Sequence, residues 1–143
     1  MKIENNELMS ENKSNLDIDK IIKHWIDTSE NDFDTMLTLN NSKSFGWALF
    51  LGHISTEKLL KALYVKRYNE HAPFTHNLYR LADLIGLDMS DEHSDWLDQI
   101  TSFNLNARYD DYKKEFLQLC THEYTQIWIE RIKTIQTWIK EML

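Results

Sequence analysis

The residues of this chain best suited to binding chemistry follow one another at positions 108–112, which read Arg-Tyr-Asp-Asp-Tyr. An arginine can hold a phosphate through two parallel hydrogen bonds, and an aspartate can orient a bound group or accept a proton. We expect the run to lie within an irregular connection, residues 104–112. Functional side chains are often placed on such loops by a rigid scaffold. The alternative is structural: Arg108 pairs with Asp110 or Asp111, and the neighbouring tyrosines pack against the scaffold.

A second polar group has helical spacing. His53, Glu57 and Lys61 are four residues apart and therefore share one face of a predicted helix. That face meets solvent, contacts a second subunit or lines a site. A metal ion needs more ligands than His53 and Glu57 supply, so we predict no metal there.

These two groups together define the predicted site. If folding brings the helix face next to Arg108, a lysine and an arginine are available to bind a phosphate, with carboxylates to orient it. The predicted ligand-binding residues are Arg108, Tyr109, Asp111, His53, Glu57 and Lys61.

The other chemically active side chains do not form a catalytic set. The sequence has no glycine-rich phosphate loop, no serine nucleophile motif and no cysteine pair at metal-binding spacing. Its one cysteine, Cys120, follows an apolar stretch, where a thiol is usually buried and unreactive. His76 stands beside Thr75, a residue that favours helix starts, and is expected to make a structural hydrogen bond. We therefore predict no catalytic residue, no metal and no cofactor.

The elements that position these residues are predicted to be helices. Apolar residues recur at helical spacing over residues 16–40. A second helix, residues 44–68, is apolar around most of its circumference, apart from the face with His53, Glu57 and Lys61. Such a helix is usually the central and most buried element of a bundle.

Capping residues place the remaining helices. Thr75 can cap a short third helix, Ser90 a fourth, and Thr121 a long last one. We therefore predict an all-α fold, an antiparallel up-and-down bundle of four to five helices over residues 16–143. Residues 1–15 are rich in Asn, Glu and Ser and are predicted to be a disordered lead-in.

Composition supports this fold and limits the partners. Three glycines and one proline are too few for a turn-rich β-fold. The net charge of −7 excludes a broad DNA-binding surface, although a local basic site remains compatible with RNA. The sequence has no apolar run long enough to span a membrane, and acidic residues stand where a signal peptide would be apolar. We expect a soluble protein of the cytoplasm.

Three segments resemble the HEPN domain family. Residues 53–63, His-Ile-Ser-Thr-Glu-Lys-Leu-Leu-Lys-Ala-Leu, are similar to the signature of the family's central helix. Residues 73–78, Pro-Phe-Thr-His-Asn-Leu, look like the Pro-x-Thr-His-x-Leu segment that leads into its third helix. Residues 106–109, Asn-Ala-Arg-Tyr, look like its late Arg-Tyr element, with Asp110 where many members have proline. The resemblance covers about residues 17–143.

The resemblance implies a helical bundle that commonly forms homodimers. It also implies nucleotide binding, RNA cleavage, or partnership with a small nucleotidyltransferase in a toxin–antitoxin-like module. The ribonuclease branch has a histidine shortly after its arginine, but here Lys113, Lys114 and Glu115 occupy those positions. No imidazole is therefore available beside Arg108 to act as acid or base. We predict a non-catalytic protein that binds a nucleotide or a protein partner, with a nucleotidyltransferase as the expected partner.

Two alternatives stay open. In the first, the protein is a metal-independent ribonuclease in which Arg108 stabilises the phosphate and Tyr109, Tyr112 or His53 transfers the proton. In the second, it is a purely structural dimerisation domain, which nothing in the sequence excludes.

Overall fold

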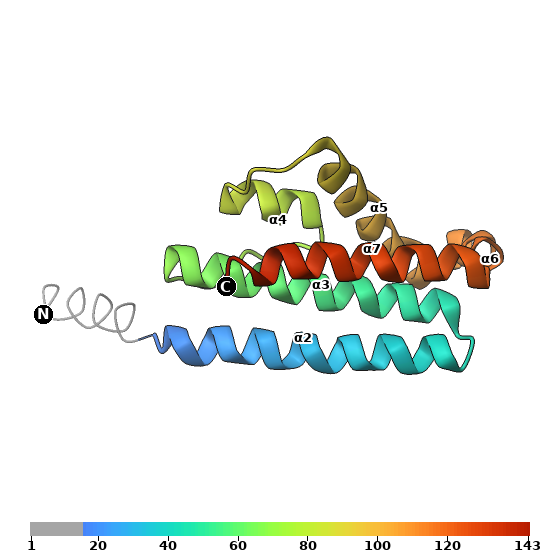
Figure 1. Cartoon of the computed structure of the whole chain (residues 1–143), viewed down its shortest axis with the longest axis horizontal. Helices are drawn as coiled ribbons and strands as arrows, with labels where there is room; N and C mark the ends of the chain where they lie inside the picture. Colours follow the sequence, from blue (N-terminus) through green and yellow to red (C-terminus); the bar gives the residue numbers. More distant parts are fainter. Residues whose placement is uncertain (1–15) are drawn as a thin grey trace, which may run out of the picture.

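The computed structural model describes residues 16–143 as six α-helices without a strand (Figure 1). They are α2 (Ile18–Asn41), α3 (Phe45–Tyr68), α4 (Leu78–Ile85), α5 (Asp91–Arg108), α6 (Asp110–Leu119) and α7 (His122–Lys140). The predicted all-α fold is confirmed. The predicted disordered lead-in, residues 1–15, lies outside the described residues. Within the described range, no helix is both long and apolar enough to cross a membrane.

Helix α3 is the centre of the bundle. It contacts α2, α4, α5, α6 and α7, and Figure 1 shows α2 antiparallel to it and α7 running alongside it in the same direction. Its apolar circumference makes this possible, because Leu49, Leu59, Leu60 and Leu63 are all buried. The prediction of a central second helix is confirmed. A polar residue on α3 is consequently held by several helices at once.

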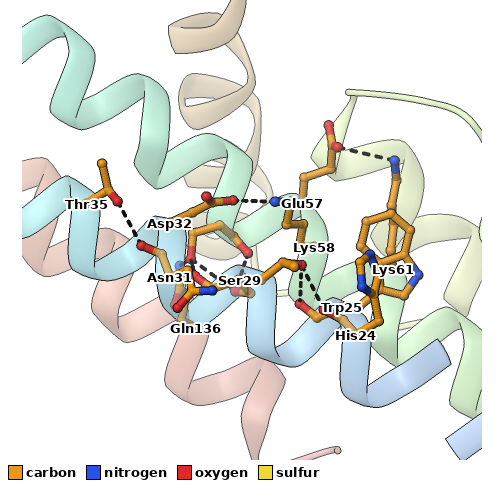
Figure 2. Close-up of polar contacts among 12 residues, drawn as sticks. His24, Trp25, Ser29, Asn31, Asp32, Thr35, Glu57, Lys58, Lys61 and Gln136 are labelled. Carbon is orange, nitrogen blue, oxygen red and sulfur yellow. Dashed lines mark hydrogen bonds and ion pairs between the residues drawn. The ribbon is translucent and has the colours of Figure 1, made fainter. Parts of the chain in front are cut away.

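Short polar side chains join α3 to α2 and α7 (Figure 2). Ser29 of α2 and Ser55 of α3 each donate a hydroxyl hydrogen bond to the other's backbone carbonyl, at 2.7 and 2.9 Å. The side-chain amide of Gln136 on α7 donates to the hydroxyls of Ser55 and Thr56. All four residues are buried, where an unpaired polar group would cost about 1–3 kcal/mol. The network therefore fixes how the three helices are placed along one another.

Helix caps fall where the sequence predicts them, except at α4. The Ser90 and Thr121 side chains each accept a hydrogen bond from the backbone N–H three residues later. Helix α4 begins at Leu78 and is capped by the Asn77 side chain, so the prediction of Thr75 as its cap is wrong. The Thr75 hydroxyl instead accepts from the Asn77 N–H, which makes a turn just before the helix.

The segment predicted to be irregular, residues 104–112, is almost entirely helical, and this prediction is wrong. Helix α5 continues through it to Arg108. After one extended residue, Tyr109 (φ −100°, ψ 124°), α6 begins at Asp110. This short extra helix brings the total in the described residues to six, where four to five were expected.

The error has a physical cause in the asparagines of α5. Asn104 and Asn106 suggest a turn in the sequence. In the structure, Phe103 and Ala107 are buried one turn apart and continue the apolar side of the helix. Asn104 is buried as well, and its amide is used in a hydrogen bond to His53 on α3. A tertiary contact thus keeps helical a segment whose residue types favour a turn.

Candidate functional site

Three predicted site residues, His53, Glu57 and Lys61, lie on one side of α3 and are buried. Their exposed fractions are 0%, 5% and 6%. The side chains that cover them come from α2, from α5 and from the connection between α3 and α4. This polar face of α3 is therefore an enclosed cluster and does not meet solvent directly.

His53 connects α3 to two other parts of the chain. Its Nε2 donates to the backbone carbonyl of His76 at 2.8 Å, and its Nδ1 accepts from the Asn104 amide at 3.2 Å. This pattern requires a neutral ring with its proton on Nε2. Burial lowers the pKa of His53, and the charge of Arg108 acts in the same direction. His53 thus holds the segment around His76 and helix α5 against α3.

Glu57 is a buried carboxylate with a partner on each oxygen. Oε1 accepts from His76 Nδ1 at 2.7 Å, and Oε2 accepts from Lys61 Nζ at 3.2 Å. The Glu57 side chain is 7% exposed, whereas that of His76 is 47% exposed. Because Nδ1 of His76 donates to the carboxylate, the lone pair of the neutral ring is on Nε2. A carboxylate paired with an imidazole in this way orients a general base.

Lys61 is held by aromatic rings as well as by Glu57. Its Nζ lies 5.4 Å from the centroid of the Trp25 ring on α2 and 5.8 Å from that of Phe74. Figure 2 shows the lysine beside Trp25 and paired with Glu57. A cation over an aromatic face is attracted to it, and the attraction grows when water is excluded. Lys61 is therefore a fixed buried charge that offsets the charge of Glu57.

Arg108 supplies an exposed cation near this cluster. It ends α5, one helical turn after Asn104, the residue that contacts α3. In the described part of the chain its guanidinium forms no hydrogen bond and no salt bridge, and it lies 5.8 Å from the Tyr109 ring centroid. The alternative that Arg108 pairs with Asp110 or Asp111 is not observed. A guanidinium without a partner is suited to binding a phosphate.

The last two predicted residues lie at the edge of this arrangement. Tyr109 is 50% exposed at the junction of α5 and α6. Asp111 is exposed in the first turn of α6, where a carboxylate complements the helix dipole. The structure therefore brings His53, Glu57 and Lys61 together, and His53 contacts Asn104 of α5, one turn before Arg108. A ligand-binding role for the six residues stays a prediction.

Sequence reasoning gave no site role to four residues that complete the cluster: Trp25, Phe74, His76 and Asn104. Each comes from an element other than α3, so no spacing rule connects it to Glu57 or Lys61. The predicted structural hydrogen bond of His76 is present, and its partner is Glu57. The one available signal was the family-like segment at residues 73–78, which contains both Phe74 and His76.

The described residues contain no arrangement suited to a metal ion. Residues 16–143 hold no group of three or more His, Cys, Asp or Glu side chains close enough to share one. Both carboxylate oxygens of Glu57 already accept hydrogen bonds from His76 and Lys61. The chemistry that this cluster offers is therefore that of a cation, a carboxylate and an imidazole.

Comparisons with known proteins agree with this architecture. The HEPN domain family model matches residues 22–142. A search of curated protein sequences finds none that matches the chain. Among solved structures, the chain is similar to the crystal structure of TT1696 from Thermus thermophilus, with a TM-score of 0.72 and 16% sequence identity, over 85% of this chain and 98% of that one. At that identity the similarity shows the fold alone. The family match spans most of the sequence, and the chain therefore belongs to the HEPN domain family.

Proposed function

We propose that this protein binds a nucleotide, without cleaving it, at the surface that His76 and Arg108 form beside the buried cluster of α3. The carrying observation is that the half-exposed His76 is paired with the buried carboxylate of Glu57, while Arg108 is an exposed cation without a partner in residues 16–143. His53 connects the two parts of the chain, because it donates to the His76 carbonyl and accepts from Asn104, one helical turn before Arg108.

The charges of this surface favour a phosphate. Lys61 offsets the negative charge of Glu57, so the carboxylate does not repel an anion nearby. Arg108 can form two parallel hydrogen bonds with phosphate oxygens. The protein as a whole carries a net charge of −7, so attraction of a phosphate depends on such a local site.

Calorimetric titration with ATP in the presence of EDTA tests this proposal. We expect binding by the natural protein and an affinity at least about tenfold lower for Arg108→Ala, since hydrogen bonds to charged groups contribute about 1.5–3 kcal/mol. Lys133→Ala is the matched control, because it removes one positive charge from α7. If neither ATP nor a single-stranded oligonucleotide binds at millimolar concentration, nucleotide binding is refuted.

The proposal extends to partners. We propose that the protein acts as a homodimer in the cytoplasm together with a nucleotidyltransferase in a toxin–antitoxin-like module. Membership of the HEPN family supports this, as does the lack of a histidine at residues 113–115. Sedimentation of the purified protein measures its dimerisation. Co-expression with a nucleotidyltransferase encoded beside it, followed by co-purification, tests the partnership, and separate elution of the two proteins would refute it.

One observation favours a second candidate, metal-independent RNA cleavage. The His76 imidazole is oriented by a buried carboxylate, and this pair supplies the acid–base group that the sequence lacks after Arg108. His76 Nε2 would accept the proton of a ribose 2′-hydroxyl as that oxygen attacks the neighbouring phosphorus. Arg108 would stabilise the charge that develops on the phosphate. The bond between phosphorus and the 5′-oxygen would break, and the leaving oxygen would take the proton back from His76. The products would be a 2′,3′-cyclic phosphate and a 5′-hydroxyl.

An RNA-cleavage assay with chelator separates the two candidates. If the protein cleaves, we expect His76→Gln and Arg108→Ala each to lose about 100-fold or more in rate, as is usual for a general base or a charge-stabilising group. The Lys133→Ala control should keep full activity. Binding of ATP without any RNA cleavage would leave the non-catalytic proposal standing and refute the enzymatic one.

A further inference from the structure

Phe74 is exposed to a degree that packing does not explain. It is 96% exposed, while the next most exposed large apolar side chains in residues 16–143 are 51% exposed. Phenylalanine is among the residues most often buried. Its ring lies outside the apolar core, beside Lys61 and His76.

The backbone that carries Phe74 is firmly held. The Thr75 N–H donates to the Pro73 carbonyl at 3.1 Å, just across Phe74. Two residues further on, the His76 carbonyl accepts the hydrogen bond from His53 at 2.8 Å. The exposed ring is therefore presented in one place by an ordered turn. Such preorganisation favours binding, because little conformational entropy is lost when a ligand arrives.

The surroundings of the ring are polar. Lys61 Nζ lies 5.8 Å from its centroid, and the His76 ring lies 6.0 Å away. An apolar protein surface docked on Phe74 would also remove the half-exposed His76 ring from water, which is costly. A flat ligand that carries polar groups avoids this penalty, because its ring covers Phe74 while its polar groups meet His76.

We infer that Phe74 is a stacking platform for the base of a nucleotide whose phosphates bind at His76 and Arg108. This inference rests on the proposed nucleotide binding and adds the group that recognises the base. Stacking on a single aromatic ring tolerates every base, so the ligand class is a nucleotide with an unpaired base. A free nucleotide and an unpaired RNA residue share this chemistry.

Calorimetric titrations with three probes test the inference: ATP, inorganic tripolyphosphate, which has the phosphates without the base, and a six-nucleotide single-stranded oligoadenylate. For Phe74→Ala we expect the affinity for a probe that has a base to fall by about 5- to 150-fold, which is the range found when other stacking residues are replaced by alanine. Affinity for tripolyphosphate should stay unchanged. Phe74→Trp should retain binding, and its added fluorescence should be quenched by ATP and not by tripolyphosphate. Ile127→Ala, which truncates an exposed apolar residue of α7, is the control.

The outcomes distinguish failure of the stacking platform from failure of the proposed nucleotide binding. A loss with ATP supports a free nucleotide as ligand, and a loss with the oligoadenylate alone supports RNA. Unchanged affinity of Phe74→Ala for both probes would overturn the platform and leave nucleotide binding intact. Binding of none of the probes by the natural protein would overturn both. If Phe74→Ala instead changes only the sedimentation of the protein, the ring belongs to a subunit interface and the inference fails.

Discussion

Replacing Glu57 by glutamine tests whether the ion pair beneath the proposed site is as enclosed as the structure indicates. Glutamine keeps the shape of the side chain and can still accept the hydrogen bond from His76. It removes the negative charge, so Lys61 is left as a buried cation without a counter-charge. We expect this variant to be markedly less stable than the natural protein.

The magnitude follows from the burial of the pair. The two side chains are 7% and 8% exposed, so water compensates the orphaned ammonium only weakly. Removing one partner of a buried ion pair typically costs about 3–5 kcal/mol. The Trp25 and Phe74 rings still attract the ammonium, by about 0.5–2 kcal/mol each. We therefore expect a loss near the lower end, about 3 kcal/mol.

Urea unfolding measures this loss. With a slope of about 2 kcal/mol per molar urea, the midpoint should fall by about 1.5 M. The control is the double variant Glu57→Gln/Lys61→Met, which removes the orphaned charge and should regain stability to within about 1 kcal/mol of the natural protein. A single variant within about 0.5 kcal/mol of the natural protein would refute the reasoning, since the lysine would then be reaching water.

The remaining predictions concern three other buried positions. Burial lowers the pKa of His53, so below about pH 6.5 the unfolded chain takes up a proton that the folded protein does not. The free energy of unfolding should therefore decrease as the pH is lowered, by up to about 1.4 kcal/mol per pH unit. Urea midpoints from pH 7.5 to 5 should show this slope reduced in His53→Gln, and parallel profiles would contradict it. Burial raises the pKa of Cys120 from 9.0 to about 11, so its reaction with a thiol reagent at pH 8 should be about 100-fold slower in the folded protein than in urea. Comparable rates would show that the thiol is accessible. A Cβ on Gly52 would lie 2.5 Å from Ile132 Cδ1 and 3.0 Å from Met36 Sδ. Gly52→Ala should therefore lower the thermal midpoint, because overpacking costs about 1–3 kcal/mol and exceeds the helix-propensity gain of about 0.5–1 kcal/mol, and a raised midpoint would contradict this.

The fold was largely predictable because its main signals are local. Periodic apolar residues and the Ser90 and Thr121 caps identify helices without knowledge of the tertiary structure. The apolar circumference of α3 predicted its central position in the same way. The prediction failed at residues 104–112, where Asn104 favours a turn but is held in a helix by its contact with His53.

The site was predictable only in part, since its residues come from separate elements. The spacing of His53, Glu57 and Lys61 showed that they share one face of a helix, but it could not show that this face is buried. Their exposure is decided by Trp25, His76 and other residues that lie far away in the sequence. The pairing of His76 with Glu57 crosses a connection whose path depends on that same packing.

The central position of α3 has a consequence for how the chain must fold during synthesis. Translation proceeds at about 5–20 residues per second. A helix near the C-terminus therefore cannot cover an earlier helix until it has itself been synthesised. When α3 leaves the ribosome α7 has not yet been made, so the surface later covered by α7 is open to water. Ile132, Ile135 and Ile139 of α7 close the core, and until they emerge the nascent chain exposes an apolar face to chaperones and to other chains.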